Sequence, residues 1–179
     1  MSETILVTGA SAGFGQAICR RLVADGYRVI GSARRIEKLR VLQEELGEAF
    51  YPLQMDVTDL SQVDHALSSL PADWDQIDVL VNNAGLALGL APAYEAEVSD
   101  WLTMIQTNIV GLTYLTRQIL PQMVQRNDGY IINLGSTAGT VPYPGANIYG
   151  ASKAFVKQFS LNLRADLAGK KIRVSNIEP

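Results

Sequence analysis

Cysteine and histidine are almost absent from this chain, and their scarcity removes whole classes of chemistry. Cys19 is the only cysteine, so no disulfide can form within the chain, and we expect a packed, inert thiol. His65 is the only histidine and lies away from every motif described below. A histidine-dependent catalytic triad and a multi-histidine metal site are therefore excluded, and no metal is expected.

An excess of basic charge is also missing. The chain carries 15 Lys and Arg residues against 18 Asp and Glu residues, a formal net charge of −3. This balance gives no general reason to bind nucleic acid or an anionic membrane. No apolar run approaches the roughly 18–20 residues that a membrane span requires, and residues 1–9 lack the pattern of a signal peptide. The sequence predicts a cytoplasmic protein without a nucleic-acid or membrane partner.

Short β-rich runs alternate with longer runs of helical periodicity along the whole chain. With 179 residues, 47% of them hydrophobic, we expect one domain around one core. The predicted strands are Thr4–Val7, Arg28–Ser32, Phe50–Asp56, Val79–Asn82, Tyr130–Leu134 and Arg173–Ile177. The predicted helices are Gly13–Ala24, Ile36–Leu46, Leu60–Leu70, Ser99–Gln125 and Tyr149–Leu167. This alternation indicates an α/β fold: a doubly wound parallel sheet with helices on both faces.

Residues at the helix ends support these boundaries. Gly26 and Gly47 follow helical runs, where a left-handed cap is favoured. Asp59 and Ser99 precede helical runs and are predicted N-caps. Pro121 lies inside the longest predicted helix and is expected to kink or break it.

The turn after the first strand combines glycines with the start of a helix. It reads Thr8-Gly9-Ala10-Ser11-Ala12-Gly13-Phe14-Gly15. Only glycine lets the backbone approach a pyrophosphate this closely, and a helix N-terminus offers unpaired N–H groups and the positive end of a dipole. The segment favours a dinucleotide site, with a tight structural turn as the alternative. The chain has no Gly-Lys-Ser/Thr sequence, which disfavours a P-loop nucleotidase.

The ends of the second and third strands carry charged residues suited to the adenosine part of a dinucleotide. Arg34 and Arg35 stand where an NAD-specific fold usually has an acidic residue. Guanidinium groups match a 2′-phosphate in charge and geometry, so NADP is favoured over NAD. Asp56, followed by Val57, could accept the adenine amino group. The alternatives are a solvated arginine pair and an acidic residue at a helix entry.

Polar and small residues follow the fourth and fifth strands. Asn82-Asn83-Ala84-Gly85 lies at the carboxyl end of a central strand, where open α/β sheets bind ligands, although an Asx-turn is the alternative. Ser136 lies within Gly135-Ser136-Thr137-Ala138-Gly139. Tyr149 and Lys153 follow at a helix start, four residues apart and hence on one face.

A tyrosine needs help to act as an acid or base at neutral pH. Free tyrosine has a pKa of about 10, so its phenolate is scarce at pH 7, but a nearby ammonium stabilises the anion. Lys153 is placed to do this for Tyr149. A Tyr-x-x-x-Lys pair taken singly is common on helix surfaces, and its meaning here comes from its combination with the other motifs.

Together these motifs resemble the classical short-chain dehydrogenase/reductase family along essentially the whole chain. The resemblance implies a Rossmann sheet of order 3-2-1-4-5-6. It also implies catalytic roles for Tyr149 as general acid/base, Lys153 as its electrostatic partner and ribose anchor, and Ser136 as donor to the substrate oxygen. Asn108, within Thr107-Asn108-Ile109-Val110-Gly111, would hold a proton-relay water. Substrate contacts fall to Ser136 and Tyr149, and NADP contacts to Gly9, Ala10, Ser11, Ala12, Gly13, Phe14, Gly15, Arg34, Arg35, Asp56, Val57, Asn83, Ala84, Gly85, Tyr149, Lys153 and Pro179.

The sequence is more similar still to the NADP-dependent 3-hydroxy acid dehydrogenases of that family. The similarity lies in Gly13-Phe14-Gly15, in residues 85–89 and 135–139, and in 159–164. It implies oxidation of serine, L-allo-threonine and related 3-hydroxy acids, and a homotetramer. Helical runs Trp101–Val124 and Phe155–Leu167 carry apolar residues on more than one face, as assembly through them would require.

The last residues of the chain, 176–179, fall where family members continue. We therefore expect a single NADP-binding Rossmann domain over 1–179 that lacks the family's C-terminal substrate loop and last strand. The expected pocket walls, Leu86–Tyr94 and Thr137–Ile148, contain no charged residue. A cation for a substrate carboxylate is accordingly expected from the lacking segment.

Two other functions compete with the 3-hydroxy acid dehydrogenase. Uncharged pocket walls also suit an NADPH-dependent reductase of uncharged ketones or aldehydes. A non-catalytic NADP(H)-binding regulator would keep the same fold and signal through a partner. The complete set of Asn108, Ser136, Tyr149 and Lys153 argues against the regulator, because a sensor needs no proton relay.

Overall fold

The computed structural model describes residues 3–179 and contains a six-stranded sheet of order β3-β2-β1-β4-β5-β6. Every neighbouring pair of strands is parallel, with Ile5 of β1 opposite Val29 on one side and Val79 on the other. The predicted parallel sheet and its order are confirmed. The strands are β1 (Thr4–Thr8), β2 (Arg28–Ala33), β3 (Phe50–Gln54), β4 (Val79–Asn82), β5 (Gly129–Leu134) and β6 (Ile172–Ile177).

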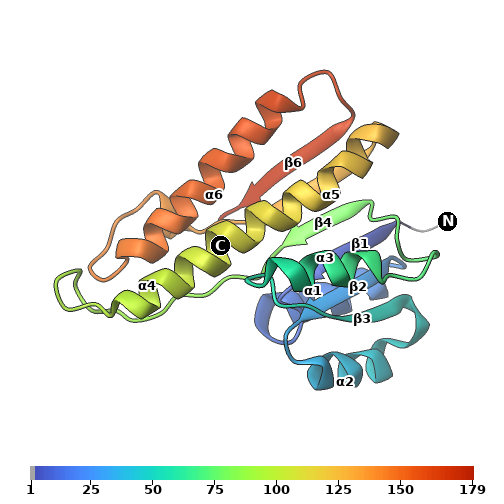
Figure 1. Ribbon diagram of the computed structural model, residues 1–179, viewed down its shortest axis with the longest axis horizontal. Helices are drawn as coiled ribbons and strands as arrows, with labels where there is room; N and C mark the ends of the chain where they lie inside the picture. Colours follow the sequence, from blue (N-terminus) through green and yellow to red (C-terminus); the bar gives the residue numbers. More distant parts are fainter. Residues whose placement is uncertain (1–2) are drawn as a thin grey trace.

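Helices cover both faces of the sheet (Figure 1). Figure 1 also shows that α4 and α5 continue one another, with α6 beside them. The helices are α1 (Gly13–Ala24), α2 (Ile36–Leu46), α3 (Leu60–Ser68), α4 (Val98–Ile105), α5 (Leu112–Arg126) and α6 (Asn147–Asp166). Within residues 3–179, no helix is both long and apolar enough to cross a membrane.

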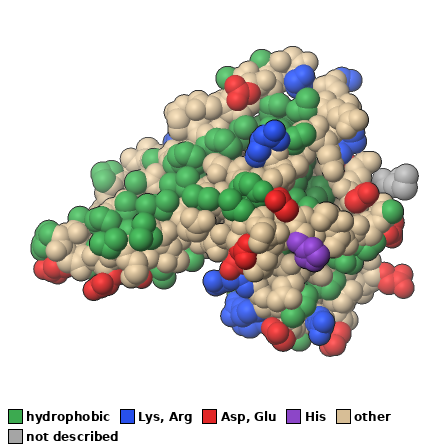
Figure 2. Space-filling model, in the orientation of Figure 1, with side chains coloured by type: hydrophobic (Ala, Val, Ile, Leu, Met, Phe, Trp, Pro, Cys, Tyr) green, Lys and Arg blue, Asp and Glu red, His purple; other side chains and the backbone are tan. Residues whose placement is uncertain are grey.

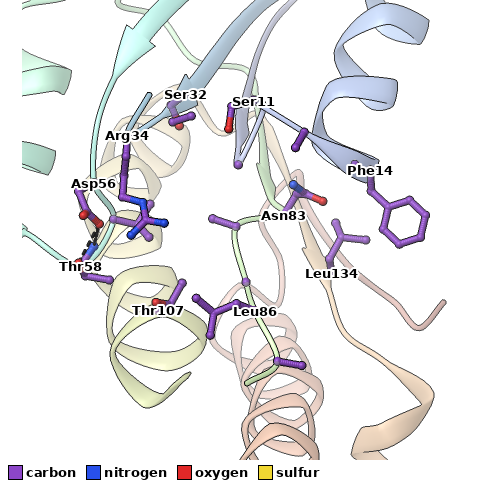
Figure 3. A pocket seen from close by; sticks show the side chains of 18 of the residues that line it. Ser11, Phe14, Ser32, Arg34, Asp56, Thr58, Asn83, Leu86, Thr107 and Leu134 are labelled. Carbon is purple, nitrogen blue, oxygen red and sulfur yellow. Dashed lines mark hydrogen bonds between the residues drawn. The ribbon is translucent and has the colours of Figure 1, made fainter. Parts of the chain in front are cut away.

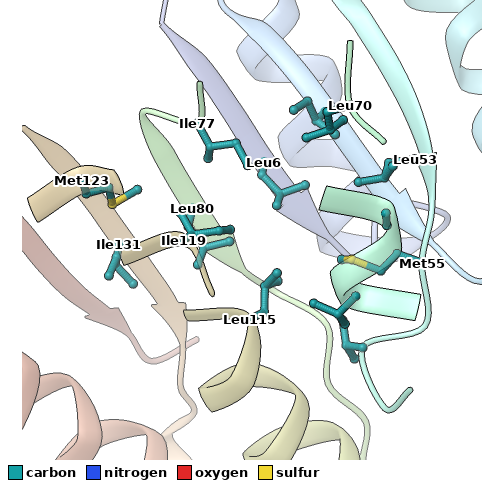
Figure 4. Packing of buried hydrophobic residues seen from close by; sticks show 14 of the residues in the cluster. Leu6, Leu53, Met55, Leu70, Ile77, Leu80, Leu115, Ile119, Met123 and Ile131 are labelled. Atoms are coloured by element: carbon teal, nitrogen blue, oxygen red, sulfur yellow. The ribbon is translucent and has the colours of Figure 1, made fainter. Parts of the chain in front are cut away.

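Each face of the sheet has its own hydrophobic cluster because alternate residues of a strand point to opposite faces. In β1, Leu6 packs in the cluster beneath α3, α5 and α6, whereas Val7 packs in the cluster beneath α1 and α2. Figure 4 shows the first cluster, where Leu80 of β4 lies beside Ile119 of α5. Fully buried strands of this kind are typical of parallel sheets and hold their carboxyl ends in a fixed order.

Cys19 belongs to the cluster beneath α1 and α2. Its side chain is fully buried, and burial raises the pKa of its thiol to about 12. A thiol with so high a pKa is almost never ionised at neutral pH. The prediction of a packed thiol is confirmed.

Several predicted helix ends agree with the structure. Gly26 and Gly47 have φ values of +88° and +71°, which non-glycine residues rarely adopt. The Asp59 carboxylate caps α3 by accepting a hydrogen bond from the backbone N–H of Gln62, at 3.1 Å. The Ser99 prediction is wrong, because Glu97 is the N-cap of α4 and Ser99 lies inside the helix without capping it.

The long predicted helix contains two features that its periodicity does not reveal. A π-helical segment, Gln106–Gly111, joins α4 to α5. Pro121 lies inside α5, which continues to Arg126, so the expected break is wrong. Ile119 and Met123 flank the proline and are buried against the sheet, which anchors the helix on both sides of the missing backbone donor.

Buried polar side chains join the ends of the central strands to the helices. The Asn82 amide donates to Asn133 Oδ1 at 2.9 Å and to Thr116 Oγ1 at 3.0 Å. The Asn133 amide donates to Ser160 Oγ of α6 at 2.8 Å, and Ser160 donates to the Val156 carbonyl at 2.7 Å. These bonds join side chains of α5 and α6 to β4 and β5.

Candidate active site

A cleft of about 700 Å³ opens at the carboxyl ends of the strands (Figure 3). The cleft gathers segments that lie far apart in the sequence, as expected where a parallel sheet reverses its strand order. Its lining consists of Gly9, Ser11, Ala12, Gly13, Phe14, Ser32, Ala33, Arg34, Arg35, Met55, Asp56, Val57, Thr58, Asn83, Ala84, Gly85, Leu86, Ala87, Thr107, Leu134, Gly135, Ser136, Tyr149, Lys153 and Pro179.

The glycine-rich turn brings bare backbone to one wall of this cleft. Gly9 has a φ of +70°, and a Cβ built on it would lie 3.0 Å from the Asn83 amide nitrogen. Ala12 is the N-cap of α1 and supplies no side-chain cap, and the first turn contains no acidic residue. The first N–H groups of α1 are therefore left for a ligand, and the dipole favours an anionic one.

The turn is tied to the segment after β4 through Thr8. Its hydroxyl accepts hydrogen bonds from the backbone N–H groups of Asn83, at 3.0 Å, and Ala84, at 2.8 Å. The Asn83 amide returns a bond to the Thr8 carbonyl at 2.8 Å. These reciprocal bonds give the floor of the cleft a fixed shape before any ligand binds.

Arg34 and Arg35, which are predicted to favour NADP over NAD, line the cleft and are exposed. One guanidinium nitrogen of Arg35 donates to Ser11 Oγ at 3.2 Å, which places that charge beside the glycine-rich turn. Arg34 extends toward the side of the cleft that carries Asp56 and Thr58 (Figure 3). Two cationic forks at the edge of an anion-binding turn suit a phosphate ester.

Asp56 is oriented by its own turn. Its Oδ1 accepts hydrogen bonds from the backbone N–H of Thr58 at 2.9 Å and from the Thr58 hydroxyl at 2.8 Å (Figure 3). Both bonds use one oxygen, so Oδ2 remains an acceptor without a partner among residues 3–179. Asp56 thus forms an Asx-turn, which leaves one carboxylate oxygen able to accept a hydrogen bond from a ligand.

The opposite end of the cleft carries Tyr149 and Lys153 on the first turns of α6. The Lys153 side chain is 7% exposed, and its Nζ donates to the Leu134 carbonyl at 2.7 Å. Nζ lies 5.9 Å from the centre of the Tyr149 ring. Burial lowers the pKa of the Lys153 ammonium from its usual value, because a charge loses solvation in the protein interior. A buried ammonium is only weakly screened and acts strongly on a neighbouring oxygen.

Ser136 lines the cleft two residues after the end of β5. Its Oγ accepts a hydrogen bond from the backbone N–H of Ala138 at 3.2 Å, which fixes the oxygen at the start of a short 3₁₀ turn, Thr137–Gly139. The hydroxyl proton has no acceptor among the described side chains and remains free to donate. The site can therefore offer a hydroxyl donor, a phenol and a buried ammonium to one ligand.

The profile of the short chain dehydrogenase family matches residues 3–179, nearly the whole chain. An NADP-dependent 3-hydroxy acid dehydrogenase of Escherichia coli is 58% identical over 175 residues, which cover 98% of this chain and 71% of that protein. A serine 3-dehydrogenase of Agrobacterium fabrum is 52% identical over 179 residues, covering 100% and 72%. This chain belongs to the short-chain dehydrogenase family.

A solved structure of a dehydrogenase has the same fold as this chain. The closed form of a serine dehydrogenase in complex with NADP⁺ superimposes with a TM-score of 0.97 at 58% identity. The match covers 98% of this dehydrogenase and 71% of that chain. The expected family, fold class and oxidoreductase character are confirmed.

Three residues predicted for the site do not line the cleft of this dehydrogenase. Ala10 is fully buried, and Gly15 packs behind the turn, where a Cβ would lie 2.4 Å from the Gly9 carbonyl oxygen. Asn108 is 1% exposed and lies in the π-helical segment. Its Oδ1 accepts from the Leu86 N–H at 2.9 Å, and its amide donates to the Leu86 carbonyl at 2.9 Å and to Ser152 Oγ at 3.0 Å.

Other lining residues of the dehydrogenase were not expected from the sequence. Most are direct neighbours of predicted residues, and adjacency to a motif is the signal that could have found them. Thr107 is also the neighbour of a predicted residue, Asn108. In the π-helical segment that contains both, Thr107 lines the cleft and Asn108 does not. The unexpected residues are Ser32, Ala33, Met55, Thr58, Thr107, Leu134 and Gly135, whereas Leu86 and Ala87 belong to an expected pocket wall.

Proposed function

We propose that this dehydrogenase oxidises the hydroxyl group of 3-hydroxy acids such as L-serine or L-allo-threonine, reversibly and with NADP⁺. The observation that carries the proposal is one cleft with a buried Lys153 beside Tyr149 at one end and Arg34 and Arg35 at the other. Relatives at 58% and 52% identity carry the names NADP-dependent 3-hydroxy acid dehydrogenase and serine 3-dehydrogenase, which supports the substrate class.

The cleft fits NADP along its length. Bare backbone at Gly9 and Gly13, together with the uncapped start of α1, would hold the pyrophosphate. Arg34 and Arg35 would hold the 2′-phosphate, and Asp56 the adenine amino group. The remaining predicted contacts that line the cleft are Ser11, Ala12, Phe14, Val57, Asn83, Ala84, Gly85, Tyr149, Lys153 and Pro179. When bound, NADP⁺ would supply the hydride acceptor in its nicotinamide ring.

The side chains of the dehydrogenase handle the substrate proton. Ser136 would donate to the substrate oxygen and hold it against Tyr149, whose phenolate takes the hydroxyl proton as the hydride leaves. The Lys153 ammonium stabilises that phenolate from nearby and would hold the ribose. Asn108 would support a proton-relay water from behind the cleft wall. Reduction runs these proton movements in reverse.

A reductase of uncharged ketones or aldehydes is the second candidate. The segments expected as pocket walls, Leu86–Tyr94 and Thr137–Ile148, contain no charged side chain, which suits an uncharged carbonyl as well. Of these segments, Leu86 and Ala87 line the cleft. Absorbance at 340 nm decides between the candidates. NADP⁺ and NAD⁺ are each tested with L-serine, L-allo-threonine and 3-hydroxyisobutyrate, and NADPH with a simple ketone. Turnover of the hydroxy acids with NADP⁺ supports the proposal, and turnover of the ketone alone favours the reductase. NADPH binding without any turnover favours a regulator.

Removing the arginines should reverse the cofactor preference. A variant with Arg34→Ala, Arg35→Ala and Ala33→Asp should bind NADPH roughly 30- to 900-fold more weakly, about 2–4 kcal/mol, if two charge-assisted contacts are lost. NADH binding should change far less. Titration calorimetry with both cofactors measures the difference. Lys38→Ala combined with Arg40→Glu, on exposed residues of α2 that do not line the cleft, makes the same change in net charge and serves as a control. Equal losses for NADPH and NADH would contradict the assignment.

We also propose that residues 1–179 make up one NADP-binding domain of a cytoplasmic homotetramer. Figure 2 shows hydrophobic side chains gathered on the lobe that includes α4 and its neighbours. Val98 and Leu102 of α4 are 62% and 61% exposed, and Leu161 of α6 is 46% exposed. Apolar surface of this extent favours burial against another copy.

Light scattering at micromolar concentration should give the mass of a tetramer. Replacing Val98 and Leu102 with aspartate should shift the mass toward smaller species, because charged groups would have to be desolvated at the contact. The same replacement at Val41, which is 65% exposed on α2, should leave the mass unchanged. A monomeric parent protein would contradict the proposed assembly.

A further inference from the structure

One buried serine connects the helix of the catalytic tyrosine to the relay asparagine. Ser152 is 1% exposed and lies on α6 between Tyr149 and Lys153. Its hydroxyl accepts a hydrogen bond from the Asn108 amide at 3.0 Å and donates to the Tyr149 carbonyl at 2.7 Å. A single side chain thus bonds to the π-helical segment and to the backbone of the first turn of α6.

The Asn108 side-chain amide uses its oxygen and its nitrogen in three hydrogen bonds. Its Oδ1 accepts from the Leu86 N–H, and its nitrogen donates both to the Leu86 carbonyl and to Ser152. The two bonds to Leu86 hold a segment that lines the cleft. Ser152 accepts the third bond, which fixes the orientation of the amide and its distance from α6.

Asn108 also lies close to Lys153. A Cβ built on Gly85 would be 3.3 Å from Asn108 Oδ1 and 3.4 Å from Lys153 Nζ, so both groups approach one point at the edge of the cleft. A displacement of the amide would therefore change the surroundings of the ammonium. We propose that Ser152 is a positioning residue: its hydroxyl orients the Asn108 amide, and through that amide it positions Leu86 and the surroundings of the Lys153 ammonium. The kinetic part of this inference rests on the proposed function.

Ser152→Ala should loosen this arrangement without unfolding the chain. Alanine has the higher helix propensity, but the substitution leaves one N–H of the Asn108 amide buried without a partner. The Leu86 N–H should then exchange with solvent at least about tenfold faster, because its acceptor is no longer held. Turnover should fall roughly 10- to 100-fold with little change in the KM for NADP⁺, since small misplacement of reacting groups has effects of this size.

Ser160 provides a matched control on the same helix. It is also 1% exposed, accepts from a buried asparagine amide and donates to a backbone carbonyl. Ser160→Ala removes equivalent bonds away from Tyr149 and Lys153. It should leave turnover, its solvent isotope effect and Leu86 exchange unchanged, whereas Ser152→Ala should raise the solvent isotope effect because proton transfer becomes slower.

The experiment combines Leu86 exchange measured by NMR with steady-state kinetics of Ser152→Ala, Ser160→Ala, Asn108→Leu and the double variant Ser152→Ala/Asn108→Leu. If Ser152 acts through Asn108, the double variant should be no slower than Asn108→Leu alone. Parental Leu86 exchange in Ser152→Ala overturns the inference, as do parental turnover in an active enzyme and additive losses in the double variant. Ser152→Cys replaces the alanine variant if that variant does not fold. If the parent oxidises none of the hydroxy acids, the proposed function fails, and Leu86 exchange alone decides the role of Ser152.

Discussion

Tyr149→Phe should lower turnover by roughly 10²- to 10⁴-fold, the usual contribution of general acid/base catalysis, or about 3–5 kcal/mol of barrier. Phenylalanine keeps the ring, its packing and most of the helix propensity, and deletes only the oxygen that exchanges the proton. The variant should therefore fold normally and bind NADPH as the parent does. Cofactor binding is measured by calorimetry and turnover at 340 nm.

Tyr114→Phe is the matched control for this experiment. The Tyr114 hydroxyl donates to the Asp64 carboxylate, at 2.8 and 2.9 Å from its two oxygens, and does not line the cleft. Its loss should leave turnover unchanged. Near-parental turnover in Tyr149→Phe would remove the catalytic assignment.

Lys153→Met should lower both turnover and NADPH affinity, in contrast to Tyr149→Phe. Methionine fills a similar volume but carries neither the ammonium that stabilises the phenolate nor a donor for the ribose. Turnover should fall by at least the same roughly 10²-fold, because the phenolate loses its partner. Affinity and turnover are measured as above. Lys157→Met, one turn further along α6 and outside the cleft, is the control.

The same variant should be more stable than the parent at neutral pH. Burial lowers the pKa of Lys153 in the folded state, so the unfolded chain binds the extra proton more readily. Stability of the parent therefore rises with pH between the lowered folded pKa and the unfolded value of about 10.5. Lys153→Met should lack that rise, and its advantage in free energy of unfolding should shrink as pH increases through this window. If the free energy of unfolding of the parent falls relative to the variant as pH rises through this window, the burial of the Lys153 ammonium is contradicted.

The sheet could be predicted because its determinants are local. Short β-rich runs bounded by helical periodicity fix the strands, and Asp59 and Gly47 mark helix ends through their own chemistry. The continuity of α5 through Pro121 could not be predicted in this way. It depends on the burial of Ile119 and Met123 against the sheet, a tertiary contact that outweighs a local penalty.

The candidate site also has parts that local sequence patterns predict and parts that they do not. The glycine-rich turn, the arginine pair and the Tyr149–Lys153 pair each lie within a few residues, so each is visible as a local pattern, and their combination resembles one family. The setting of Asn108 depends on Leu86 and Ser152, which lie 22 residues before it and 44 residues after it. No local pattern reports a contact at that separation, and the π-helical segment that carries Asn108 has no signature in the periodicity.

Transfer of the substrate's own hydrogen tests the central claim most directly. The dehydrogenase is incubated with NADP⁺ and L-serine deuterated at the hydroxyl-bearing carbon, and the reduced dinucleotide is analysed by mass spectrometry and NMR. The account predicts one deuterium per NADPH formed, and slower turnover than with unlabelled serine where hydride transfer limits the rate. NADPH that forms without deuterium, or serine consumption without any NADPH, would contradict it.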